Sequence, residues 1–240
     1  LFLMQDAESL KDQASAAMRE KRYADAVRIY RVMAREDPAW RLSLGMALVY
    51  GGEHREAATE LAAVIARDPK PGAAHVFLGV ARLKLKQPCE AIGPLETSLK
   101  WAERPVTRWE ELADAYQGCR RWRDAARAYH EAAKANRDEA ARLQRQEAHC
   151  WRMAGQYDLA RELFAALDAR YAGNAEFEFE FGDTLLRLEG AAAGLSRLER
   201  AVGKDASLQP ARAALGRALM ELGRPADAIP HLEAASASDA

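Results

Sequence analysis

The sequence predicts an all-α fold built from antiparallel pairs of helices, and two observations carry this prediction. The first is the stretch Trp109–Tyr129. Its first half places apolar residues at i, i+3, i+4 and i+7, which is one face of a helix: Trp109, Leu112, Ala113 and Tyr116. After a break at Gly118, Ala125 and Tyr129 lie four residues apart and open a second apolar face. The stretch therefore predicts two helices joined by a short turn.

The second observation is that small residues recur along the chain in register with Ala125, at steps of 31, 34, 34, 35, 34 and 34 residues: Ala26, Ala57, Ala91, Ala125, Ala160, Gly194 and Ala228. Four residues after each comes a large apolar residue: Tyr30, Leu61, Leu95, Tyr129, Phe164, Leu198 and Leu232. Twelve residues before each comes another small one: Ala14, Gly45, Gly79, Ala113, Ala148, Gly182 and Gly216. Because helices approach closely only where no bulky side chain separates them, these positions predict the contact between paired helices.

The recurrence divides the chain into seven repeat units, at about 7–38, 39–71, 72–105, 106–139, 141–174, 175–208 and 209–240. Pro38 and Pro69 fall where one unit ends and the next begins. The stretch Glu176–Asp183 alternates as a β-strand would, but Gly182 and Leu185 continue the helical register, so we expect a helix there. We expect residues 1–240 to form one solenoid in which each unit packs on its neighbours.

The spacing W-x2-L-A-x2-Y followed by A-x3-Y resembles the tetratricopeptide repeat (TPR), with Ala113 where the family usually has Gly. The resemblance extends over about the whole chain. It implies a right-handed superhelix, an α-solenoid, whose concave face is lined by the first helix of each unit. It also implies a non-catalytic interaction scaffold or adaptor that holds a protein or peptide partner in this groove, as an extended segment or a helix.

The groove positions of the family fall on residues whose character changes along the chain. In the second and third units they are apolar: Leu42, Met46, Val49, Tyr50, Val76, Phe77, Val80 and Leu83. In the fourth unit they are acidic: Glu110, Glu111 and Asp114. In the fifth they are basic, and in the sixth mixed: Arg142, Arg145, His149 and Arg152, then Phe179, Glu180, Asp183 and Arg187.

An exposed apolar stripe in the second and third units would mark the partner contact, because large exposed apolar patches usually mark interaction sites. Two alternatives remain open. In the first, Phe77, Val80 and Leu83 are buried by tight curvature of the superhelix or by residues 1–4 folding back. In the second, the charges of units four and five pair with each other. The Lys and Asn pair with which chaperone-binding TPRs hold a terminal carboxylate is absent, since Lys11 is followed by Ser15.

No motif for catalysis, cofactor binding or metal binding is present. The chain lacks a phosphate-binding G-x-x-x-x-G-K loop, a G-x-S-x-G nucleophile elbow and an H-E-x-x-H zinc motif. His149 and Cys150 are adjacent and therefore point about 100° apart on a helix. We expect no enzyme activity, no cofactor and no metal.

Charge and hydropathy limit the classes of partner that the sequence predicts. The formal net charge is −1, so no strong field attracts nucleic acid or an anionic membrane. No apolar run approaches the roughly 20 residues of a membrane-spanning helix, so no membrane insertion is expected. The five tryptophans lack an accompanying basic groove and do not predict base stacking.

Two cysteines and the first residues bear on the compartment, which stays open between the cytoplasm and an exported location. Cys89 opens one helix and Cys119 closes another on neighbouring units, so they form either a disulfide across a loop of about 30 residues or two reduced thiols. A disulfide would imply an oxidising compartment. Leu1–Met4 are either an added helical turn or the tail of a signal peptide. The preference for Arg over Lys, 27 of 35, suggests a bacterial source.

Two further functions compete with the scaffold. In one, the repeats are the recognition arm of a larger enzyme or regulator whose functional domain lies outside residues 1–240. In the other, the module self-assembles into a homo-oligomer through its last helix, where Ile229 and Leu232 lack a polar capping helix.

Overall fold

A computed structural model describes residues 2–70, 72–101 and 106–236, with side chains from residue 8 onward except at 106 and 107. Within these residues the chain is helical and contains no strand. Seven helices precede residue 121: α1 (Phe2–Arg19), α2 (Tyr23–Glu36), α3 (Arg41–Gly51), α4 (His54–Arg67), α5 (Gly72–Lys84), α6 (Pro88–Leu99) and α7 (Val106–Gly118). Seven follow: α8 (Trp122–Ala135), α9 (Ala140–Met153), α10 (Tyr157–Tyr171), α11 (Ala175–Glu189), α12 (Ala191–Lys204), α13 (Gln209–Glu221) and α14 (Pro225–Ser236).

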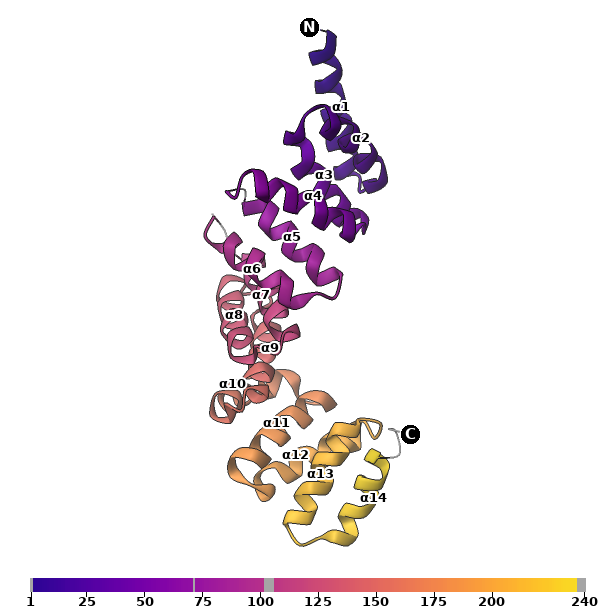
Figure 1. Cartoon of the computed structure of the whole chain (residues 1–240). Helices are drawn as coiled ribbons and strands as arrows, with labels where there is room; N and C mark the ends of the chain where they lie inside the picture. Colours follow the sequence, from indigo (N-terminus) through magenta and orange to yellow (C-terminus); the bar gives the residue numbers. More distant parts are fainter. Residues whose placement is uncertain (1, 71, 102–105, 237–240) are drawn as a thin grey trace. The chain divides into compact units, whose positions relative to one another are not determined.

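The chain divides into two compact bodies, an N-terminal body (Leu1–Arg121) and a C-terminal body (Trp122–Ala240). Within each body every helix packs against the next one in the chain (Figure 1). The first helices of successive repeats also touch, α3 with α5 and α5 with α7 in one body, and α9 with α11 and α11 with α13 in the other. The predicted all-α fold of consecutive helix pairs is confirmed, whereas a single solenoid over residues 1–240 stays a prediction.

Helix α11 contains the stretch whose alternation suggested a strand, and the helical assignment is confirmed. Phe177 and Phe181 are four residues apart, so they lie on one helical face, where both are buried. Phe179 is half-buried and packs against a different core cluster, which includes Leu186. A period of two therefore also produces the i, i+4 pair that a helix needs.

The contact between the two helices of a repeat pairs a small residue with a large one. A Cβ atom built on Gly79 would lie 2.4 Å from Cγ of Leu95, and one on Gly45 would lie 2.6 Å from Cγ of Leu61. The same close approach, 2.6 Å, recurs between Gly216 and Leu232. At these distances an added methyl group would force the leucine side chain or the helices to shift, so glycine fits this spacing of the helices.

The identity of the large residue follows that of the small one throughout the chain. Where the first position is Gly the partner position is Leu, in four repeats: Gly45 and Leu61, Gly79 and Leu95, Gly182 and Leu198, Gly216 and Leu232. Where it is Ala the partner position is aromatic, in the other three: Ala14 and Tyr30, Ala113 and Tyr129, Ala148 and Phe164. The branched side chain of Leu needs the space that the methyl group of Ala would fill, so it is combined with Gly. The flat ring of Tyr or Phe can lie beside that methyl group. Packing at this contact therefore depends on the pair of residues together.

Cys89 and Cys119 are joined by a disulfide bond, with their Cα atoms 5.1 Å apart. The bond connects the start of α6 to the residue just after α7. A Cβ atom on Gly118 would lie 2.6 Å from Cβ of Pro88, so the two helix ends meet closely at this point. Cys150, the remaining cysteine, is buried and takes no part in a disulfide. The disulfide thus links the third and fourth repeats inside the N-terminal body.

We expect Gly79→Ala to lower the free energy of unfolding by about 1–3 kcal/mol, because the added methyl group meets Leu95. The double variant Gly79→Ala/Leu95→Phe should regain much of this loss, since Ala is combined with an aromatic residue at these two positions in the sequence of three other repeats. Urea denaturation monitored by circular dichroism measures both.

Gly93→Ala is the matched control, because no atom lies within 4 Å of a Cβ at this exposed position of α6. It should raise the free energy of unfolding by about 0.5–1 kcal/mol through helix propensity alone. Equal effects of the two glycine substitutions would contradict the packing argument.

Removal of the disulfide by Cys89→Ser/Cys119→Ser should cost about 3–4 kcal/mol, because the bond closes a loop across a sequence separation of 30. A thiol reductant should destabilise the wild type by a similar amount and leave the double variant unchanged. A wild type whose denaturation midpoint ignores the reductant would show that the bond does not constrain the unfolded chain.

Candidate functional site

The apolar groove residues of α3 and α5 are mostly half-buried. Leu42, Phe77 and Val80 pack against the core of the N-terminal body, and Val49 belongs to that core. Met46, Val76 and Leu83 are also only partly accessible. Tyr50 is the exception, with 52% of its surface exposed. Of the predicted apolar stripe, only the Tyr50 side chain is therefore largely exposed, and the other residues are buried or half-buried.

Tyr50 is the middle member of an aromatic row that crosses three helices. Its ring stacks on that of Tyr23 at the start of α2, with centroids 5.6 Å apart, and meets the edge of Phe77 in α5 at 5.7 Å. Residues around Tyr23 and Tyr50 also line a shallow hollow between the first and second repeats. Tyr23 was missed because it belongs to a second helix, outside the family's groove positions. The row holds Tyr50 in place while one side of its ring stays accessible.

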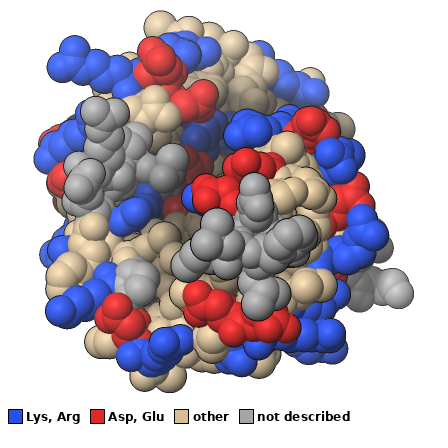
Figure 2. Space-filling model, turned by 90° about the horizontal axis from the view of Figure 1, so that it is seen from above, with Lys and Arg blue, Asp and Glu red and all other residues tan. Residues whose placement is uncertain are grey.

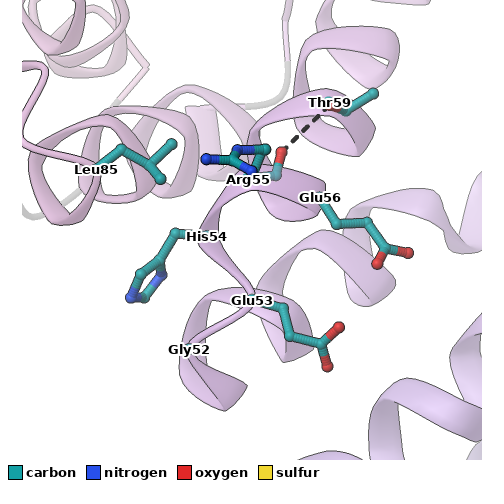
Figure 3. A pocket seen from close by; sticks show the side chains of 7 residues that line it. All are labelled: Gly52, Glu53, His54, Arg55, Glu56, Thr59 and Leu85. Atoms are coloured by element: carbon teal, nitrogen blue, oxygen red, sulfur yellow. Dashed lines mark hydrogen bonds between the residues drawn. The ribbon is translucent and has the colours of Figure 1, made fainter.

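A second shallow hollow follows at the turn between α3 and α4 (Figure 3). In the close-up, the side chains of Glu53 and Glu56 point away from Leu85, while Arg55 extends toward it. Both carboxylates contact the Arg31 guanidinium, at 3.7 and 2.9 Å. The acidic groups here are used in ion pairs, and the hollow does not assemble a catalytic pair.

The three acidic groove residues of α7 lie on one helix but in different environments. Asp114 is exposed, whereas Glu110 and Glu111 are half-buried. The Oε2 atom of Glu111 is buried without a hydrogen-bond partner. Burial, followed by repulsion from Glu110 and Asp114, raises the pKa of Glu111 to about 7, against a smaller opposing effect of Arg108. The anionic form of Glu111 is therefore destabilised in the folded protein.

Three of the four basic groove residues of α9 are paired with acidic residues of α11, whereas Arg142 donates to Glu139, directly before its own helix, at 2.7 Å. Arg145 lies 3.2 Å from Glu176 and 3.7 Å from Glu180, and His149 Nδ1 lies 2.5 Å from Glu180. One helical turn further on, Arg152 donates to Asp183 at 2.8 Å. These pairs join the first helices of the fifth and sixth repeats.

Asp183 is the centre of the largest of these clusters and is 2% exposed. Besides Arg152, it accepts hydrogen bonds from Arg187 Nε at 3.2 Å and from Arg217 Nη2 at 3.4 Å. Arg217 lies on α13, in the seventh repeat. It occupies the position equivalent to Asp183, directly after the small residue of the helix contact. Continuing the groove positions into the last unit would have identified it.

The described residues offer no group of three or more side chains arranged to hold a metal ion. His149 is engaged with Glu180, and the neighbouring Cys150 is fully buried. On the face shown in Figure 2, Lys and Arg side chains alternate with Asp and Glu, without a large area of either sign. None of the helices in the described part of the chain combines the length and apolar character needed to cross a bilayer.

Comparison with known proteins identifies the repeat. The tetratricopeptide repeat profile matches residues 42–105, 110–175 and 179–240. No curated relative matches the sequence.

Three solved structures are similar to this chain at low sequence identity. YrrB, described as a TPR protein with an unusual peptide-binding site, is 17% identical with a TM-score of 0.66, over 76% of this chain and 95% of that one. A TPR protein from Parabacteroides merdae ATCC 43184 is 14% identical with a TM-score of 0.59, over 97% and 93%. MamA from residue 41 onward, from Desulfovibrio magneticus RS-1, is 16% identical with a TM-score of 0.61, over 68% and 92%. At these identities the likeness concerns the fold alone.

The raised pKa of Glu111 predicts a pH-dependent stability. Between pH 4.5 and about 7 the folded protein keeps a proton on this carboxyl that the unfolded chain has released. The contribution of this proton to the free energy of unfolding is therefore complete below pH 4.5. It is lost as the pH rises to about 7. Glu111→Gln should be more stable than the wild type by about 1–3 kcal/mol at pH 8 and equal to it near pH 4.

Urea titrations at both pH values measure this difference. Glu36→Gln is the control, because it removes the same charge from an exposed position at the end of α2. A Glu111→Gln variant that is no more stable than the wild type at pH 8 would contradict the burial argument.

Proposed function

The chain belongs to the tetratricopeptide repeat family, and we propose that it is a scaffold that binds a peptide or partner helix on the first helices of its repeats. Repeats of this family serve as protein–protein interaction scaffolds and are generally non-catalytic, which agrees with the missing catalytic motifs. The finer proposal rests on Tyr50, which is half exposed on α3 between two other aromatic rings.

The chemistry of Tyr50 suits a contact residue. An exposed tyrosine offers a large apolar face and a hydroxyl, and little conformational freedom is lost when it is already held by neighbours. Tyr23 and Phe77 supply that support. Half-buried apolar side chains beside it, such as Met46 and Leu83, would extend the contact once a partner excludes water.

The two alternative functions make different predictions. A recognition arm would use the same surface within a longer protein, so the sequence of the full gene separates it from a self-sufficient scaffold. Self-assembly would instead use α14, where Ile229 is 50% exposed. The mass in solution as a function of concentration tests that alternative.

Selection from a random peptide display library on the immobilised full chain tests the proposal. Peptides selected on the wild type should bind Tyr50→Ser at least about tenfold more weakly, because exposed tyrosines at the centre of contacts commonly contribute more than 1 kcal/mol.

Val32→Ser is the matched control, since Val32 is 49% exposed but lies on the second helix of its repeat, α2. Its affinity should change less than twofold. Peptides that bind Tyr50→Ser as tightly as the wild type, or no selected peptides at all, would overturn the proposal. Phe77 and Val80 are poorer choices for substitution, because they pack against the core.

A further inference from the structure

Three guanidinium groups in the C-terminal body converge on a single carboxylate. Arg152 from α9, Arg187 from α11 and Arg217 from α13 all donate to Asp183. Of the carboxylates in the described part of the chain, only Asp183 lies within 4.0 Å of these three arginines. The cluster therefore carries a local excess of two positive charges.

The three arginines differ in accessibility. The side chain of Arg152 is 12% exposed, whereas those of Arg187 and Arg217 are 43% and 52% exposed. Arg152 lies against the ring of Phe179 and Arg187 near that of Tyr157, with distances to the ring centroids of 5.6 and 5.9 Å. The inner guanidinium thus completes the buried ion pair, and the two outer ones keep donor groups toward solvent.

The neighbouring carboxylates of α11 are engaged with other residues of α9, not with Arg187 or Arg217. Glu180 and Glu176 engage His149 and Arg145 one turn away along α9, at 2.5 and 3.2 Å. The His149 ring adds a positive charge there only when it is protonated. The positive excess itself lies at the end of α9 and α11 where Arg187 lies, together with Arg217. Two like charges held beside one carboxylate repel each other, and an added anion would relieve that repulsion.

We propose that Arg187 and Arg217 form a binding site for a carboxylate side chain of an acidic partner peptide, with Asp183 and Arg152 positioning them. This site deepens the proposed function and rests on it, because it names a second chemical feature of the peptide. Guanidinium groups bind carboxylates with paired, charge-assisted hydrogen bonds, and partly desolvated aromatic surroundings strengthen such bonds.

The confined charge favours a peptide over nucleic acid. A polyanion needs basic groups repeated along its path, since each phosphate contact contributes separately to affinity. Here Arg145 and His149, which would continue the path along α9, are already paired. Two partly exposed guanidinium groups at one place fit one or two carboxylates instead.

Fluorescence anisotropy of the full chain at low salt tests the site, with a labelled twelve-residue peptide of alternating Glu and Ser as probe. The same peptide with Gln in place of Glu should bind at least tenfold more weakly to the wild type. Arg187→Gln/Arg217→Gln should weaken binding of the Glu peptide at least tenfold. The affinity of the single variant Arg217→Gln for the Glu peptide should fall between those of the wild type and the double variant. This variant leaves the buried pair of Arg152 and Asp183 intact.

The charge-matched control is Arg123→Gln/Arg127→Gln, which removes two exposed arginines from α8, a second helix. It should change affinity less than twofold. Equal weakening of binding by both double variants would overturn the proposed site. So would a wild type that binds the Glu and Gln peptides equally well, or that binds neither. Circular dichroism must show the same helix content in every variant.

Two further arms separate this proposal from others. Tyr50→Ser should bind the Glu peptide within twofold of the wild type, so the aromatic contact can fail while the arginine site stands. A single-stranded oligonucleotide of twelve thymidines should bind at least tenfold more weakly than the Glu peptide. Equal or tighter binding of the oligonucleotide, lost in Arg187→Gln/Arg217→Gln, would overturn the peptide assignment in favour of a phosphate polymer.

Discussion

The fold depends on one contact, the approach of a small residue on the first helix of a repeat to a large residue on the second. Leu95 occupies the space that a Cβ on Gly79 would need, and the same holds for Leu61 beside Gly45. Elsewhere Ala is matched with an aromatic residue. Because the contact lies inside each helix pair, it does not itself use the groove positions of the first helix. Those positions are where side chains can vary in character from repeat to repeat.

The fold could be predicted from sequence because this contact recurs. Its small and large positions are short-range features, and even the alternating stretch in α11 kept its register through Gly182. The candidate site was harder to predict from the sequence. Which groove side chains are exposed, and which charged groups are paired, depends on the neighbouring repeats. The groove positions place Phe77 and Tyr50 together, yet Phe77 packs on the core and Tyr50 remains exposed. No periodicity in one chain segment distinguishes these outcomes.

The charged positions illustrate the same limit. Arg145, His149 and Arg152 form a basic band in sequence, but each faces an acidic residue of α11 that lies 31 positions further along. Pairing neutralises most of the band and leaves an excess only beside Asp183, where a third arginine arrives from α13. The first helices of the two bodies therefore differ in chemistry: Tyr50 is exposed in one, and three arginines contact Asp183 in the other.

The central claim is that partners bind the first helices while the second helices hold the fold together. Amide hydrogen exchange of the full chain, alone and saturated with a display-selected peptide, tests it most directly. Binding should slow exchange in α3 and α5 and leave α4 and α6 unchanged. Slowing confined to α4 and α6 would contradict the claim and move the partner surface to the other side of the repeats.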